Sequence, residues 1–145
     1  LSYPTKTDDA NYRKITKLIN EFPKNIIGIS DHVEPEEHMI SGPICLSLGA
    51  KIFEKHFTLD RTMGGGSSFS MNPKDLQKYV RNIHLTERLL GENEQKVYEA
   101  EKNTRNSARR SLVANVDLAI GTIISKDKIG VKRPGTGILP DKIDD

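Results

Sequence analysis

Two short apolar runs that each end in a histidine constrain the fold of this chain more than any other feature. Residues 25–32 read NIIGISDH and residues 51–56 read KIFEKH, and each begins with residues that favour β-strands. Residues 37–48 between them have a helical pattern, which Gly49 ends. A strand, a helix and a second strand in so short a segment predict a right-handed βαβ unit of a parallel sheet.

Helical patterns lie on both sides of this unit. Apolar residues spaced three or four apart predict them, and Asn72 and Gly91 suit the start and the end of the longest one. The expected helices cover residues 10–22, 73–90 and 92–106. Residues 1–5 have the pattern of the end of a strand that runs into a loop.

The pattern changes after about Ala108, where short β-like runs separated by turn residues replace the helices. These runs cover residues 110–114, 120–124 and 129–132. We place a domain boundary between residues 103 and 107. The prediction is therefore an α/β unit over residues 1–105 and a small β-rich unit over residues 106–145.

Composition excludes several classes of function. The net charge is +2 with acids and bases interleaved, so nothing requires a nucleic-acid partner. No apolar run approaches the roughly 18–20 residues of a membrane span, and we expect a cytoplasmic protein without membrane contact. The single cysteine, Cys45, lies among apolar residues and is expected to be a buried thiol. The chain begins with Leu, which is typical of a fragment or a processed piece.

The two histidines are the first candidates for a site. Ligands of parallel α/β sheets bind beyond the carboxyl ends of the strands, and His32 and His56 lie at two such ends. Two imidazoles can hold a divalent ion and leave positions for water and substrate oxygens. The alternative is that each histidine has a structural role, and the residues alone leave both interpretations open.

Polar neighbours of the histidines also have two interpretations each. Ser30 either caps the following loop or donates a hydrogen bond to a substrate oxygen, and Asp31 either caps or orients His32. Lys55 and the pair Asp60–Arg61 form either a solvated rim or an electropositive site for phosphate or carboxylate.

Two loops complete the candidates. Residues 64–66 are three glycines that match no phosphate-binding motif, and we expect a mobile loop over the mouth of the site. Arg133 opens the segment RPGTG, which is either a surface turn or a rigid loop that presents a guanidinium to a ligand. His38 and His84 lie in helical segments and are not expected to have a functional role.

Taken in order, seven segments of the chain resemble the sialic acid synthase family, which includes N-acetylneuraminate, legionaminate and pseudaminate synthases. The segments are YPT, DAN, GISDH, LGAKIFEKHFTLDR, FSMNP, RRSLVA and VKRPGTGI. The resemblance implies the carboxy-terminal part of a (β/α)8 TIM barrel followed by a small β-rich antifreeze-like (SAF) domain, both incomplete. It covers the chain essentially from end to end.

The resemblance also implies an activity. Members of the family condense phosphoenolpyruvate with an N-acetyl amino sugar such as N-acetylmannosamine, giving a nine-carbon 2-keto acid and phosphate. The implied cofactor is a divalent metal, typically Mn2+, with Mg2+ or Co2+ as alternatives. The implied assembly is a homodimer in which the SAF domain of one subunit caps the barrel of the other.

The resemblance assigns roles to six residues. His32 and His56 match the metal ligands, and Tyr3 and Ser30 match residues beside phosphoenolpyruvate. Arg133 matches the arginine that reaches the sugar's N-acetyl group in the other subunit. Ser67 is the nearest match to a loop aspartate of many members, and its loop is one residue shorter here.

The acid/base and phosphate-binding residues of the family match nothing in this chain and are expected upstream. A β/α barrel needs roughly 250 residues, so we expect the isolated chain to be inactive. The rival hypothesis is a truncated homologue that acts as a binding or assembly module. A third class, a barrel enzyme with another substrate such as an aldolase, leaves KRPGTG unexplained.

Overall fold

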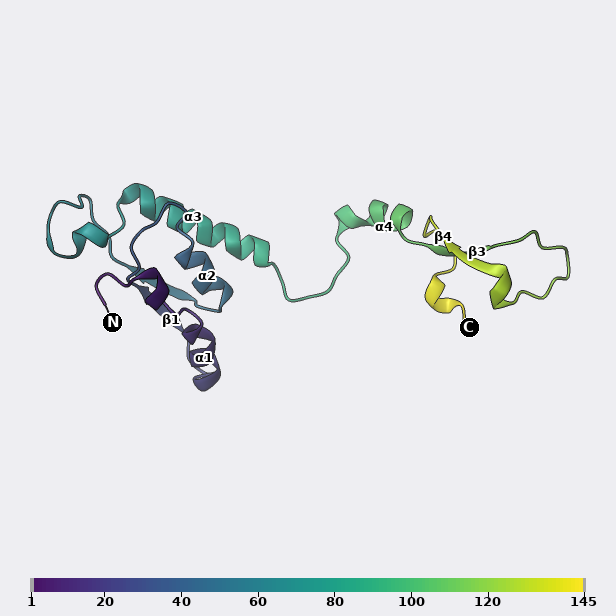
Figure 1. Cartoon of the computed structure of the whole chain (residues 1–145), viewed down its shortest axis with the longest axis horizontal. Coiled ribbons are helices and arrows are strands. Elements are labelled where there is room, and N and C mark those ends of the chain that lie inside the picture. Colours follow the sequence, from purple (N-terminus) through teal and green to yellow (C-terminus); the bar gives the residue numbers. More distant parts are fainter. Residues whose placement is uncertain (1, 145) are drawn as a thin grey trace. The chain divides into compact units, whose positions relative to one another are not determined.

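The computed structural model describes residues 2 to 144 and divides the chain into two compact units, residues 1–92 and residues 93–145. Each unit is described by itself (Figure 1). The division falls after Glu92, so residues 93–105 group with the second unit. The predicted boundary lies further along the chain, between residues 103 and 107.

The first unit contains the predicted βαβ arrangement. Strands β1 (Gly28–Asp31) and β2 (Ile52–Lys55) pair in parallel, with Gly28 opposite Ile52 and Asp31 opposite Lys55. The crossover helix α2 (Ser41–Ser47) lies between them in sequence, and Gly49 ends it with a φ of 101°, as predicted. The parallel pairing confirms the prediction made from the two histidine-ending runs.

Helix α2 begins four residues after the predicted start. The carboxylate of Glu36 accepts hydrogen bonds from the backbone N–H groups of His38 and Ile40, each at 2.6 Å. Met39 has a φ of 51°, which a helix does not allow. Residues 36–40 therefore form a capped loop, and the helix starts at Ser41.

The core of the unit lies between the strands and the helices on one face of the sheet. Helix α1 (Lys14–Glu21) contributes Ile15, which packs with Cys45 of α2 and with Ala50. Ile29 and Phe53 come from the same face of the two strands. Cys45 is fully buried, which confirms the expected buried thiol. Helix α1 starts later than the predicted residue 10. A 3-10 turn, η1 (Thr7–Asp9), and Asn11 with a φ of 44° come before it.

Helix α3 (Pro73–Leu90) has the bounds that the sequence predicts. The Asn72 side chain accepts from the N–H groups of Lys74 and Asp75, and the Asp75 carboxylate accepts from the N–H of Asn72, which makes a capping box. The helix lies beside α2 (Figure 1). The buried Tyr79 of α3 packs against Gly42 of α2. None of the described helices is long and apolar enough to cross a membrane.

The second unit is built on one antiparallel pair. Strand β3 (Ser111–Ala114) pairs with β4 (Ile129–Lys132), as two of the predicted β runs require. The third run, residues 120–124, is not a strand, and the prediction there was wrong. Gly121 has a φ of 85°, and Ile120 and Ile123 are exposed without a neighbouring strand among the described residues.

Short helices complete this unit. They are η3 (Glu99–Glu101), α4 (Lys102–Ala108), η4 (Lys126–Lys128) and η5 (Pro140–Lys142). The helix predicted over residues 92–106 was right only in its second half, because residues 92–98 are not helical. In the first unit a further 3-10 helix, η2 (Gly65–Phe69), follows the strand β2 and includes two of the three glycines of residues 64–66.

Candidate functional site

The ends of β1 and β2 bring the two histidines together. His32 and His56 each follow the last residue of a strand, and their ring centroids lie 4.8 Å apart in an edge-on arrangement. Tyr3 joins them, with its ring centroid 4.4 Å from that of His32 and 5.8 Å from that of His56. The structure thus places three of the six predicted site residues in one aromatic cluster.

The hydrogen bond of His32 identifies the nitrogen left for a ligand. Its Nδ1 lies 3.2 Å from the carbonyl oxygen of Ser30. A carbonyl can only accept, so Nδ1 carries a proton, and in the neutral imidazole the lone pair is then on Nε2. This is the arrangement that orients metal-binding histidines in proteins.

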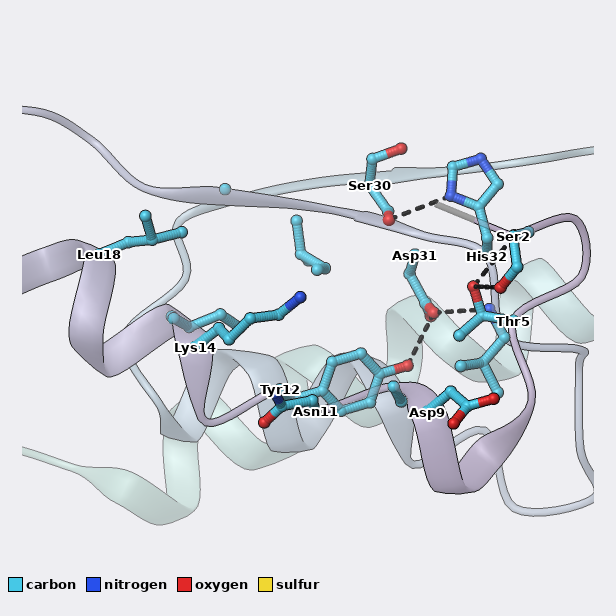
Figure 2. Close-up of a pocket in the computed structure, with 15 residues that line it drawn as sticks. Ser2, Thr5, Asp9, Asn11, Tyr12, Lys14, Leu18, Ser30, Asp31 and His32 are labelled. Carbon is cyan, nitrogen blue, oxygen red and sulfur yellow. Dashed lines mark hydrogen bonds between the residues drawn. The ribbon is translucent and has the colours of Figure 1, made fainter.

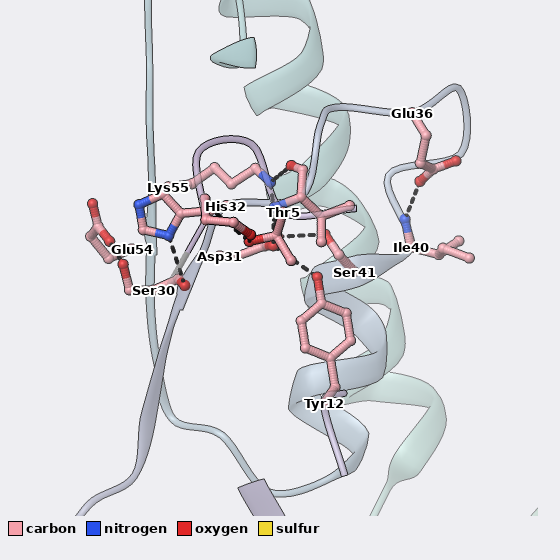
Figure 3. Close-up of polar contacts among 12 residues, drawn as sticks. Thr5, Tyr12, Ser30, Asp31, His32, Glu36, Ile40, Ser41, Glu54 and Lys55 are labelled. Atoms are coloured by element: carbon pink, nitrogen blue, oxygen red, sulfur yellow. Dashed lines mark hydrogen bonds and ion pairs between the residues drawn. The ribbon is translucent and has the colours of Figure 1, made fainter. Parts of the chain in front are cut away.

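The Asp31 carboxylate makes no hydrogen bond to the His32 ring, so the interpretation that it orients this ring as a direct partner was wrong. Successive residues of a strand point to opposite faces, so the Asp31 side chain turns toward the helices while the His32 ring turns away from them. The carboxylate instead accepts from Tyr12 Oη at 2.8 Å, Ser41 Oγ at 2.7 Å and Lys55 Nζ at 3.0 Å. Figure 3 shows these donors converging on Asp31.

Burial and hydrogen bonding shift the pKa values in this network. Burial alone would raise the pKa of Asp31, but the Ser41 hydrogen bond and the charge of Lys55 outweigh it, and the pKa is lowered. Burial, followed by the hydrogen bond to Asp31, raises the pKa of Tyr12. Burial is also the main reason why the pKa of Cys45 is raised to about 12. Asp31 therefore stays charged and the two other groups stay neutral at ordinary pH.

The predicted electropositive mouth is absent from the described residues around β2. The Lys55 side chain is 5% exposed and its charge is paired with Asp31, so it lies behind the histidines rather than at a rim. Arg61 is paired with the Asp75 carboxylate, and its Nε donates to the carbonyl of Ser70. Both cations are thus paired with carboxylates of the fold.

Two residues that sequence reasoning missed belong to the site. Glu54 lies opposite Ser30 in the strand register, and its carboxylate accepts a hydrogen bond from the Ser30 hydroxyl. The signal was available, because Glu54 is two residues before His56 and so shares its face of the strand. Phe69 of η2 has its ring centroid 5.5 Å from that of His56 and 6.3 Å from that of Tyr3; no pattern in the sequence indicates this.

The glycine loop lies directly against His56. A Cβ on Gly66 would come within 3.2 Å of His56 Nδ1, so only glycine leaves this side of the imidazole free of contact. The next residue, Ser67, turns its hydroxyl back to the carbonyl of Gly64 within the loop. The role predicted for Ser67 toward the sugar stays a prediction.

Arg133 belongs to the second unit, where it is exposed at the end of β4. The loop that follows it is anchored: Ser111 Oγ donates to the carbonyl of Pro134 at 2.7 Å and accepts from the N–H of Gly137 at 2.8 Å. A Cβ on Gly135 would lie 2.4 Å from that of Arg109, so the loop packs tightly there. The loop is therefore anchored, and the role predicted for Arg133 toward a ligand stays a prediction.

A cavity of about 530 Å³ lies along β1 (Figure 2). Its walls come from residues 2–18 and 28–33, including Tyr12, Asp31 and His32. Within the described part of the chain β1 pairs only with β2, and just beyond its end Val33 forms a parallel bridge with Thr5. The cavity therefore marks an edge of the sheet where further backbone can pair.

The donor set fits part of a divalent metal site. His32 and His56 offer two imidazoles at close range, and Nε2 is the His32 nitrogen that is not engaged by the Ser30 carbonyl. Among residues 2 to 144, no group of three or more His, Cys, Asp and Glu side chains gathers as a metal site would require. Water, substrate oxygens or residues outside this chain would have to complete the coordination.

Comparisons with known proteins agree with both units. Residues 1–95 match the NeuB family, and residues 109–145 match the SAF domain. The chain is 34% identical over 143 residues to the N,N'-diacetyllegionaminic acid synthase of Legionella pneumophila, covering 98% of this chain and 39% of that protein. It is 35% identical over 132 residues to the human N-acetylneuraminate-9-phosphate synthase, covering 90% of this chain and 36% of that protein.

A solved structure gives the same picture. The crystal structure of a spore coat polysaccharide biosynthesis protein from Bacillus subtilis superposes with a TM-score of 0.56 at 33% identity. The match covers 95% of this chain and 42% of that one. The chain thus spans about two fifths of the length of the relatives it matches.

Proposed function

This chain belongs to the NeuB family, and we propose that it forms the carboxy-terminal part of a synthase barrel followed by the amino-terminal portion of a SAF domain. The synthase would condense phosphoenolpyruvate with N-acetylmannosamine or a related N-acetyl amino sugar. A bond forms between the enol carbon of phosphoenolpyruvate and the aldehyde carbon of the sugar. Addition of water releases phosphate and leaves a 2-keto acid.

The observation that carries this proposal is the pair of imidazoles at adjacent parallel strand ends, with centroids 4.8 Å apart. His32 and His56 would hold the divalent metal, Mn2+ first and Mg2+ or Co2+ as alternatives. When bound, such a metal supplies Lewis-acid polarisation of a carbonyl oxygen. The backbone carbonyl of Ser30 fixes the His32 ring so that Nε2 faces the ligand.

Other residues of the chain would bind and orient the substrates. Tyr3 lies against both imidazoles, and its hydroxyl would donate to the carboxylate of phosphoenolpyruvate. Ser30, whose hydroxyl donates to Glu54 in this structure, would turn that hydroxyl to the substrate as a second donor. Ser67 would face the sugar from the loop beside His56. Arg133, carried on its anchored loop, would reach the N-acetyl group in the other subunit of a homodimer.

The unpaired edge of β1 is the basis for proposing that further barrel strands belong to the synthase. The free edge of β1 would pair with upstream barrel strands, which would also carry the acid/base residues. The isolated chain would then be inactive, and the complete synthase would act in the cytoplasm. The support is the family match together with coverage of about two fifths of each relative.

Phosphate release tests the proposal. The complete synthase that carries these residues is incubated with phosphoenolpyruvate, Mn2+ and N-acetylmannosamine or a related hexosamine. We expect phosphate release that depends on sugar and metal, and a loss of at least about 100-fold in His32→Gln and His56→Gln. His84→Gln is the matched control, because His84 is exposed on α3 and lies outside the cluster.

Two results would contradict the proposal. One is phosphate release with neither metal nor sugar dependence. The other is the absence of release with every hexosamine tested, which would favour the non-catalytic binding module.

A further inference from the structure

A buried ion pair lies directly behind the two histidines. Asp31 and Lys55 are the last residues of β1 and β2, and they are opposite each other in the parallel register. Lys55 Nζ lies 3.0 Å from Asp31 Oδ2, and the two side chains are 5% and 0% exposed. Each of the two therefore immediately precedes one of the histidines.

The Asp31 carboxylate has a donor at every lone pair. Oδ1 accepts from Tyr12 Oη at 2.8 Å and from the N–H of Val33 at 3.1 Å. Oδ2 accepts from Ser41 Oγ at 2.7 Å and from Lys55 Nζ at 3.0 Å. An ionised carboxylate accepts about four hydrogen bonds, so this one is saturated.

The same network holds the backbone on both sides of His32. Lys55 Nζ also donates to the carbonyl of Val33, whose N–H is bound by Asp31. The carbonyl of His32 accepts from the N–H of Thr5 at 2.8 Å. The peptide group that follows His32 is thus bonded at both its C=O and its N–H, and the next carbonyl, that of Val33, is bound by a residue of the strand that precedes His56.

Stability alone does not explain such a pair. Removing two charges from water costs about as much as their attraction returns, and apolar residues in the same place are often equally stable. What the pair does specify is alignment, because a slip of one residue between strands would turn each side chain to the other face. His32 and His56 depend on that alignment, because each directly follows one residue of the pair.

We propose that Asp31 and Lys55 are positioning residues, which fix the alignment of β1 and β2 so that His32 and His56 can bind one divalent cation together. Neither side chain contacts an imidazole, and both act through the backbone between Asp31 and Val33 and through the strand pairing. The part of the proposal that concerns the cation rests on the proposed function. The part that concerns the separation of the imidazoles does not.

The experiment measures both parts on the 145-residue chain. The nuclear Overhauser effect between the ring protons of His32 and His56 reports their separation without metal. The ligand-field absorption of added Co2+ reports the affinity of the site. The variants are Lys55→Met, which removes the charge at similar length, and Asp31→Asn, which keeps the carboxylate's shape.

The matched control is Ser41→Ala. It removes one donor from the same Asp31 Oδ2 but leaves the bond between the strands intact. We expect the cross-peak between the rings to weaken in Lys55→Met and Asp31→Asn, and Co2+ affinity to fall by about 10-fold or more. Ser41→Ala should keep both close to their original values.

The proposal is overturned if both charge variants keep the original cross-peak and Co2+ affinity, or if Ser41→Ala weakens them equally. Asp31→Asn alone decides the matter where Lys55→Met does not fold, since it is the milder change. Where the 145-residue chain binds no Co2+, ligands from outside it are needed to complete the coordination, and the Co2+ measurement is made on the complete synthase. In that case the cross-peak still decides whether the ion pair positions the rings.

Discussion

Replacing Gly42 by alanine would test how closely α2 must approach α3. A Cβ at this position would lie 2.6 Å from Cζ and 2.7 Å from Cε2 of Tyr79, and 2.8 Å from Cδ1 of Ile83. The Tyr79 ring is 2% exposed and has little room to move. Helix α2 would therefore have to shift, and with it Ser41, whose hydroxyl binds Asp31.

Two opposing effects set the magnitude. Alanine is a better helix former than glycine by up to about 1 kcal/mol, and less so in a first turn, where Gly42 lies. Overpacking a filled interface costs about 1–3 kcal/mol. The second effect is larger, so we expect Gly42→Ala to lower the free energy of unfolding by about 1–2 kcal/mol.

Urea unfolding followed by circular dichroism measures this change through linear extrapolation. The control is the same substitution in a Tyr79→Leu background, where most of the ring atoms that the methyl would meet are gone. There we expect Gly42→Ala to be neutral or stabilising, with a coupling of about 1 kcal/mol or more between the two positions. An equal cost in both backgrounds, or a stabilising effect in the original chain, would refute the packing argument.

Three further predictions concern the first unit. Asn72→Ala removes the side chain of the capping box and should lower stability by about 1 kcal/mol in urea unfolding, while Asn72→Asp should keep most of it; equal losses in the two variants would contradict the capping role. Cys45 is buried and its pKa is raised to about 12, so the native chain should not react with a thiol reagent at pH 8, whereas the chain in urea should; rapid reaction of the native chain would show that the thiol is accessible. The hydrogen bond from the N–H of Thr62, and then that from its hydroxyl, lower the pKa of Asp60. The ionised Asp60 therefore stabilises the fold above its unfolded pKa of about 3.9, and this stability is lost as pH falls through the lower folded pKa. An NMR pH titration should show this, with a higher pKa in Thr62→Val, and a pKa unchanged by that substitution would contradict the assignment.

The βαβ unit could be predicted because its signals are local. Each strand is a short apolar run, the crossover between them is helical, and Gly49 and Gly91 end helices where the chain needs them. The two histidines could be placed near each other for the same reason, since parallel strands present their carboxyl ends at one edge. The distance of 4.8 Å between their ring centroids agrees with that argument.

The network behind the histidines could not be predicted, because it depends on contacts between distant residues. Tyr12, Ser41 and Lys55 are 19, 10 and 24 positions from Asp31, and no spacing rule joins them. The direction of Asp31 could have been read from strand alternation, which places it on the face opposite to His32. The strand predicted over residues 120–124 was wrong for another reason. Their apolar side chains have a strand pattern, but no described strand lies beside them to pair with.

The central claim is that His32 and His56 bind one metal ion together, and an anomalous difference map at the manganese absorption edge tests it most directly. Crystals of the complete synthase would be grown with Mn2+ and phosphoenolpyruvate. The account predicts one strong peak within coordination distance of Nε2 of both histidines, with Nδ1 of His32 still donating to the carbonyl of Ser30. A peak elsewhere in the barrel, or none between the two rings at full manganese loading, would contradict it.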